Sequence, residues 1–136
     1  MRYNGVIQRK LALLDDQVAK LSESLRDVPY ENFKDDWILR SMAERALQVA
    51  VEIMIDIAER IMAIKDAGPV AGAAEAMSKL VALGVLEDES PYIEMVRFRN
   101  LIVHEYETIN PEILYKLATV RLTDFRKFRD ELDKAT

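Results

Sequence analysis

The sequence predicts an all-α protein, an up-and-down bundle of four main helices with one additional short helix. Apolar residues recur at spacings of three and four along most of the 136-residue chain, which is the pattern of amphipathic helices. The chain has only 4 glycines and 4 prolines, too few for the closely spaced turns of an all-β fold. A chain of this length can bury its own core, so we expect residues 1–136 to form a single helical domain.

The first predicted helix covers residues 2–25. It ends at Asp27-Val28-Pro29, because proline disfavours helical geometry in the residue before it. The apolar stripe that predicts this helix consists of Val6, Ile7, Leu11, Leu14, Val18, Leu21 and Leu25.

The second predicted helix is the longest. Asp35 or Asp36 can cap its first turn, and Gly68-Pro69 ends it at about Ala67. At roughly 30 residues it would be about 45 Å long, which exceeds the width of a domain of this size. We therefore expect it either to kink or to extend as part of a helical hairpin. Its apolar positions are Trp37, Ile38, Met42, Ala46, Val49, Ala50, Ile53, Ile57, Ile61 and Ile64.

Three further helices are predicted from residues that typically start or end a helix. A short helix over residues 71–83 should end at Gly84 in a left-handed cap position. Ser90-Pro91 is typical of an N-cap followed by proline at the first helical position, and Asn110-Pro111 repeats the pattern. The last helix should run through about Leu132, with core candidates Ile113, Leu114, Leu117, Val120, Leu122, Phe125 and Phe128.

Composition excludes several classes of protein. The chain has no cysteine, so disulfides, thiolate metal sites and cysteine nucleophiles are excluded. There is no run of 18 apolar residues and no signal-peptide pattern, so we expect a cytoplasmic protein that does not enter a membrane. The net charge of −5 argues against a protein that coats nucleic acid through bulk electrostatics, although a nuclease with a local basic pocket remains compatible with it.

The stretch Arg99–Tyr106, RNLIVHEY, carries the chemistry. It contains the only histidine of the chain, and arginine and histidine together suit a phosphate ester because one grips oxygens and the other moves a proton. At about 100° per residue, Arg99 and Tyr106 lie about 20° apart on the apolar side of the predicted helix, whereas His104 lies about 140° from Arg99 and near Asn100. Either the helix loosens near Val103 or the site is completed from elsewhere.

Taken singly, each of these residues also has a structural explanation. Imidazolium near a helix C-terminus is favoured by the helix dipole, an arginine at the edge of an apolar face is often ion-paired or extended to solvent, and a tyrosine there is often part of the core.

The residues match a family motif when they are taken together. Arg99, four intervening residues, His104, Glu105 and Tyr106 fit the arginine-x4-histidine-x-tyrosine motif of the HEPN superfamily, and Asn100 fits the small polar residue that follows the arginine. The turn at residues 30–33, the segment DDWILRSMAERALQVAVEIMIDIAERI and the GVLEDES stretch before the motif resemble the HepT branch of minimal HEPN proteins over nearly the whole chain.

The resemblance implies a metal-independent endoribonuclease without a cofactor, the toxin of a type VII HEPN/MNT toxin–antitoxin pair. Its partner would be an MntA-type nucleotidyltransferase antitoxin that attaches AMP to Tyr106 and so silences the toxin. Arg99 and His104 would be catalytic residues and Asn100 would support them. The acidic residues at positions 56 and 59 are weaker candidates for the site.

The implied chemistry is consistent with these residues. RNA supplies its own nucleophile, the 2′-hydroxyl, so the enzyme needs proton transfer and stabilisation of the phosphate. An acid and a base on opposite sides of the phosphate require two histidines, which a homodimer would supply. An acidic protein would suit a selective substrate, such as a structured RNA of the tRNA kind. Two alternatives are a non-catalytic helical adaptor that binds a nucleotide or a nucleotidyltransferase, and a structural dimer without a site.

Overall fold

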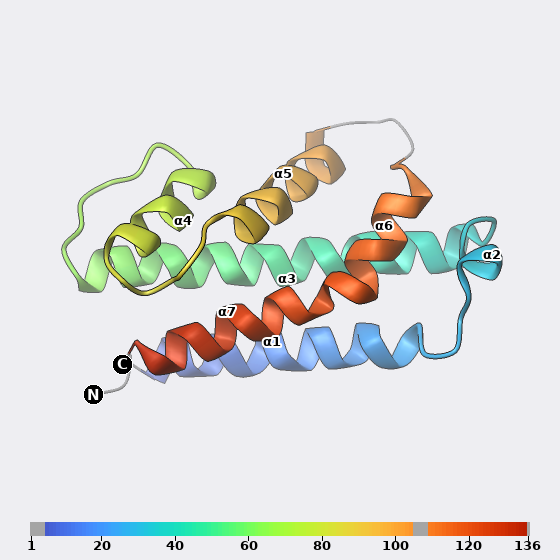
Figure 1. The fold of residues 1–136 in the computed structure, drawn as a ribbon, viewed down its shortest axis with the longest axis horizontal. Helices are drawn as coiled ribbons and strands as arrows, with labels where there is room; N and C mark the ends of the chain where they lie inside the picture. Colours follow the sequence, from blue (N-terminus) through green and yellow to red (C-terminus); the bar gives the residue numbers. More distant parts are fainter. Residues whose placement is uncertain (1–4, 105–108, 136) are drawn as a thin grey trace.

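The fold is all-α, as predicted. A computed structural model of the chain describes residues 5–104 and 109–135, with only the backbone at His104. Within these residues every regular element is a helix: α1 (Gly5–Ser24), α2 (Tyr30–Phe33), α3 (Trp37–Ile64), α4 (Ala73–Ala82), α5 (Ser90–His104), α6 (Pro111–Ala118), the 3₁₀ helix η1 (Val120–Leu122) and α7 (Thr123–Lys134). In Figure 1, α1, α3, α5 and the α6–α7 arm run alternately in opposite directions along the long axis. None of the described helices is long and apolar enough to cross a bilayer.

Helix α3 is the centre of the bundle. It packs against α1, α4, α5 and α6, and its 28 residues form one uninterrupted helix that spans most of the long axis (Figure 1). Asp36 caps it, because one carboxylate oxygen accepts hydrogen bonds from the backbone N–H groups of Ile38 and Leu39, each at 3.0 Å. The helix ends at Ile64, earlier than predicted, where Asp66 adopts a left-handed φ of 52°.

The core lies on the predicted face of α1, except that Val6 is 36% exposed. In α3 the prediction was only partly right, because Ala50, Ile57 and Ile61 are the predicted positions that are buried and Ile64 is 46% exposed. The core side of α3 also contains residues that the prediction left out: Ala43, Leu47, Val51, Met54, Ile55, Ala58 and Met62. The buried side chains include Leu11 and Leu14 of α1 and Met54, Ile57 and Ile61 of α3. The stripe of α3 extends beyond the core at its N-terminus: Trp37 is 66% exposed and Ile38 is 64% exposed. Both occupy the first turn of α3, and no described residue covers them.

The last predicted helix is broken into two. Thr119 adopts φ −127° and ψ −86°, which is not helical, and it separates α6 from η1 and α7. The Thr119 hydroxyl donates to the carbonyl of Tyr115 at 2.6 Å, a local side-chain bond of the kind that competes with the helical ladder. Two predicted core residues are therefore wrong: Val120 follows the break and is 71% exposed, and Ile113 lies outside the buried face of α6, formed by Leu114, Leu117 and Ala118, and is 53% exposed.

The other residues predicted to begin or end helices do so, with one exception at the start of α5. Gly84 has φ 79° directly after α4, and the Asn110 carboxamide accepts from the N–H groups of Glu112 and Ile113 at 2.8 and 3.4 Å to cap α6. Ser90 is the first residue of α5 rather than its N-cap. The carboxylate of Asp88 accepts from the Ser90 N–H at 3.0 Å instead.

Candidate functional site

Helix α5 carries the motif and is fixed along its inner side. Tyr92, Met95, Val96 and Phe98 are buried, and the helix packs against α3 and α4. The hydroxyl of Tyr92 donates to the buried carboxylate of Glu131 in α7 at 2.6 Å. The motif therefore lies at the end of a helix whose other end is held by both the core and a buried hydrogen bond.

The Glu131 carboxylate was not anticipated from the sequence as part of this arrangement. Its second oxygen accepts from the backbone N–H of Glu87 at 2.6 Å, in the loop before α5. Burial raises the pKa of the Tyr92 phenol, and the hydrogen bond to Glu131 raises it further, so the phenol remains a neutral donor. The sequence does contain a sign of this buried carboxylate. Glu131 lies three residues after Phe128 and directly before Leu132, so it falls on the apolar side of the last helix.

Arg99 lies half-buried in α5, and its Nε atom is buried without a hydrogen-bond partner in the described structure. No described carboxylate forms an ion pair with it: the ion pairs among these residues involve other cations. A buried donor without a partner costs about 1–3 kcal/mol. Among the described residues, therefore, the Nε donor of Arg99 is buried at a cost and no carboxylate pairs with its charge.

The helix does not loosen near Val103, because α5 remains α-helical through His104. At about 100° per residue, Arg99 and position 104 therefore stay about 140° apart around the helix. Asn100 is exposed and lies one turn before position 104, on the same side. The side chain of His104 and the whole of Tyr106 lie outside the described residues.

The two weaker acidic candidates lie elsewhere on α3. Asp56 forms ion pairs with Lys10 of α1 and with Arg60, and the hydrogen bond from Lys10 holds its pKa below the ordinary value. Glu59 is exposed and has no ion pair within the described ranges. Asp56 therefore connects α3 to α1. No group of three or more His, Cys, Asp or Glu residues in the described part of the chain could hold a metal ion.

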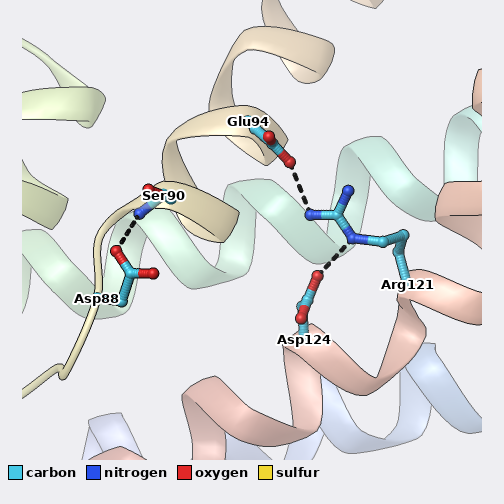
Figure 2. A network of polar contacts seen from close by, with 5 residues as sticks. All are labelled: Asp88, Ser90, Glu94, Arg121 and Asp124. Atoms are coloured by element: carbon cyan, nitrogen blue, oxygen red, sulfur yellow. Dashed lines mark hydrogen bonds and ion pairs between the residues drawn. The ribbon is translucent and has the colours of Figure 1, made fainter.

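A second polar cluster joins α5 to the α6–α7 arm. Figure 2 shows Arg121 of η1 between Glu94 of α5 and Asp124 of α7. Its Nη2 atom donates to Glu94 at 2.8 Å and its Nε atom to Asp124 at 2.7 Å. These bonds raise the pKa of Arg121, the one from Asp124 most strongly. No pattern in the sequence predicts this cluster, because its members come from three separate elements.

Comparison with known proteins identifies the family of the chain. A family model described as ribonuclease HepT-like matches residues 14–132. The mRNA nuclease HepT of Shewanella oneidensis is 26% identical over 129 residues, which are 93% of this chain and 96% of that protein.

Solved structures match over almost the whole chain. One is the tri-AMPylated HEPN toxin of Shewanella oneidensis in complex with MNT antitoxin, with a TM-score of 0.89 and 25% identity over 97% of this chain and 99% of the other. Another is a toxin–antitoxin crystal structure with AMP-PNP, with a TM-score of 0.88 and 24% identity over 96% and 99% of the two chains. This second likeness establishes the fold alone.

Proposed function

The chain belongs to the ribonuclease HepT-like family, and on that premise we propose that it is the toxin of a HEPN/MNT toxin–antitoxin pair and an endoribonuclease that needs no metal ion. The observation that carries the proposal is Arg99. Its half-buried guanidinium has no ion pair with a described residue, and it precedes the only histidine of the chain by five positions. Cleavage of a phosphodiester requires a cation that can bind the phosphate and a group that can transfer a proton.

The proposed reaction uses the 2′-hydroxyl of RNA as the nucleophile. A neutral His104 accepts the proton of the 2′-hydroxyl while the 2′-oxygen forms a bond to phosphorus. The bond from phosphorus to the 5′-oxygen breaks, and a protonated histidine donates a proton to that leaving oxygen. Arg99 stabilises the negative charge on the non-bridging oxygens. The products are a 2′,3′-cyclic phosphate and a 5′-hydroxyl.

A homodimer would supply the second histidine. One protomer has a single histidine, and the regular geometry of α5 keeps Arg99 and position 104 on different sides of the helix. Two copies with their motif helices facing each other would bring an arginine from one side and a histidine from the other to one phosphate. Two-fold symmetry is the commonest arrangement of such pairs.

Replacing His104 tests the enzymatic proposal. We expect His104→Ala to lower the rate of RNA cleavage by about 100-fold or more, since general acid–base catalysis contributes at least that factor. Asn100→Ala should cause a smaller loss. The measurement is cleavage of a pool of RNA by the purified protein in the presence of a chelator, with the chemistry of the new ends determined by end-labelling.

Three outcomes distinguish the alternatives. Loss of cleavage with unchanged melting temperature and oligomeric state supports the enzyme. A lower melting temperature of the His104→Ala variant supports a structural role for His104. Wild-type protein that never cleaves RNA but retains a nucleotidyltransferase partner would be the non-catalytic adaptor, and activity abolished by the chelator would contradict the metal-independent mechanism.

Regulation would act on Tyr106, outside the described residues. In the proposed step, the phenolic oxygen of Tyr106 bonds to the α-phosphorus of ATP and pyrophosphate leaves, so the tyrosine gains AMP. The added negative charge and bulk would compete with the RNA phosphate for Arg99. The enzyme that catalyses the step would be the MntA-type nucleotidyltransferase encoded beside this chain.

Co-expression with that nucleotidyltransferase tests the regulation. The intact mass of the chain should rise by whole AMP units, and the added mass should lie on the peptide that contains Tyr106. Tyr106→Phe should retain cleavage and escape silencing. Tyr115→Phe, a matched change at a tyrosine whose hydroxyl donates to the carbonyl of Val28, should still be silenced. Silencing of the Tyr106→Phe variant would contradict the modification model.

A further inference from the structure

A groove lies between α5 and α6, on the side of α5 that carries position 104 and away from the side that carries Arg99. Its floor is apolar and is formed by Phe98 and Leu101 of α5 and by Ile113 and Leu117 of α6. Its volume is about 430 Å³, within the range of sites that hold a small organic group. Leu101 is 47% exposed and Ile113 is 53% exposed, so the floor is accessible to a ligand.

The rim of the groove carries more positive than negative charge, although the whole chain has a net charge of −5. Three cations line it, Arg97, Lys116 and Arg121, together with the carboxylates of Glu94 and Glu112. Arg121 forms ion pairs with Glu94 at 2.8 Å and with Asp124 at 2.7 Å, as Figure 2 shows, so its charge is shared between two carboxylates.

Two of these cations remain available. Arg97 and Lys116 are exposed, and neither forms an ion pair with a described residue. Once Arg121 and Glu94 are paired, Glu112 is the one rim carboxylate that opposes them. The groove therefore combines an apolar floor with two cations that are free to meet an anion.

The groove is continuous with the motif end of α5. Arg97 lies seven residues before position 104, so the two positions are about 20° apart around the helix and about 10 Å apart along it. Leu101 lies one turn before position 104 on the same side. Arg99 is about 200° from Arg97. The cation that shares a side of α5 with the histidine position is thus Arg97, which the family motif does not include.

We propose that this groove holds a nucleotide of single-stranded RNA next to the scissile phosphate. The base packs on Leu101 and Ile113, and a backbone phosphate lies between Arg97 and Lys116. Proteins that bind single strands combine a cationic groove with side chains, most often aromatic, that pack on the faces of the bases. The inference rests on the proposed function, since it assigns the position of the RNA strand that leads into the site.

A second copy of the chain fits the groove less well. A groove on the axis of a two-fold dimer would face an identical groove, so each pair of cations would approach the other. A flat base attached to a phosphate fills the volume and supplies the opposite charge. Charge and shape together favour RNA as the occupant.

Binding of an RNA that cannot be cleaved tests the groove directly. The probe is a short fluorescent single-stranded RNA whose 2′-hydroxyls are replaced by fluorine, which removes the nucleophile. We expect the Arg97→Ala, Lys116→Ala double variant to bind more weakly, and the slope of log K against log salt to fall by about 0.7 for each phosphate contact removed. The matched control is Arg126→Ala, Lys127→Ala, which removes two exposed cations of α7 and should change neither quantity.

The floor has its own test. An RNA that carries 5-iodouridine should crosslink on irradiation to peptides that contain Leu101 or Ile113, and Ile113→Ser should reduce the yield several-fold. Ile113 is exposed, so this variant should fold normally. The melting temperature of each variant shows whether it is folded.

The outcomes separate the groove from the nuclease proposal. If the wild type cleaves RNA while the double variant keeps its affinity and salt slope, the groove proposal is overturned and the nuclease stands. If the double variant loses RNA binding but the wild type never cleaves, the groove stands and the nuclease proposal fails. If the double variant changes only the oligomeric state or antitoxin binding, or if the wild type does not bind the probe, the groove does not hold RNA.

Discussion

Arg99 has a cost in stability that its surroundings do not offset. Its Nε atom is buried and has no hydrogen-bond partner among the described residues. An unmade hydrogen bond of a buried donor costs more than the same bond gains when it is made. An arginine retained under these conditions is more readily explained by binding than by folding, and stability measurements can separate the two.

We expect Arg99→Met to abolish RNA cleavage while leaving the free energy of unfolding unchanged or raising it by up to about 1 kcal/mol, because methionine fills a similar volume without a polar atom that needs a partner. Arg97→Met is the matched control. Arg97 is exposed, and its replacement should change stability by less than about 0.5 kcal/mol. Urea unfolding followed by circular dichroism gives both values. A large loss of stability in Arg99→Met alone would assign Arg99 to the fold.

The bond from Tyr92 to Glu131 has the opposite character, since both partners are buried and satisfied. Tyr92→Phe removes a donor from a buried carboxylate, and we expect it to lower the free energy of unfolding by about 1–3 kcal/mol. Tyr30→Phe makes the same chemical change at a hydroxyl that has no hydrogen bond with another described residue, and should cost less than about 0.5 kcal/mol. Equal losses in the two variants would show that the bond to Glu131 contributes nothing specific.

Helices α1 and α3 are joined at the surface by the ion pairs of Asp56 with Lys10 and Arg60. The hydrogen bond from Lys10 lowers the pKa of Asp56 below 3.8, its ordinary value. A lowered pKa in the folded state means that the carboxylate stabilises the fold above the unfolded-state pKa. This stabilisation disappears as the pH falls through the folded-state pKa.

We therefore expect Asp56→Asn to reduce the free energy of unfolding at pH 7 by at most about 1 kcal/mol, since the pair is partly exposed. The difference from the wild type should shrink as the pH falls and vanish below the lowered pKa of Asp56. Glu59→Gln, a neutralisation of the neighbouring exposed carboxylate, should show no such dependence on pH. Urea unfolding at several pH values and moderate salt provides the comparison. A difference that persists at low pH would contradict the electrostatic explanation.

The helix boundaries were predictable to the extent that they depend on local chemistry. Asp36 and Asn110 cap their helices through their own carboxylate and amide oxygens, and Gly84 adopts the conformation that glycine favours. The break at Thr119 was not predictable in this way. Thr119 is tolerated inside a helix as well as outside it, and the balance depends on how α6 and α7 pack against the rest of the bundle.

The site was predictable only in part for a similar reason. The spacing of Arg99 and His104 is a property of the sequence, and resemblance to a family identified it. The hydrogen-bond partner of Tyr92 comes from α7, and the cations across the groove from Arg97 come from α6 and η1, far along the chain. Their proximity depends on the packing of whole helices, which periodicity does not specify.

The whole molecule offers a single histidine to a reaction that needs an acid and a base. If two copies each supply His104 to one site, mixing wild type with His104→Ala should reduce the activity by more than the fraction of variant chains in the mixture. With equal amounts exchanged to equilibrium, about one quarter of the dimers contain two histidines. We expect about a quarter of the wild-type activity per chain, against about half if each protomer acts alone.

The measurement is a titration of wild type with increasing His104→Ala at constant total protein, after unfolding and refolding the mixture together. A mixture prepared without exchange is the control and should follow a straight line. A straight line after exchange would contradict the shared site and return the second proton-transfer role to another group on the same chain.

The exposed position of Trp37 determines how these experiments can be read. It is the only tryptophan of the chain and it is 66% exposed in the first turn of α3. Its emission should already resemble that of a solvated indole in the native state and should change little when the core melts. The same property makes it an intrinsic reporter of association, because a partner that covers this end of α3 would shift its emission to shorter wavelength. The native chain thus carries a label-free probe at one defined surface.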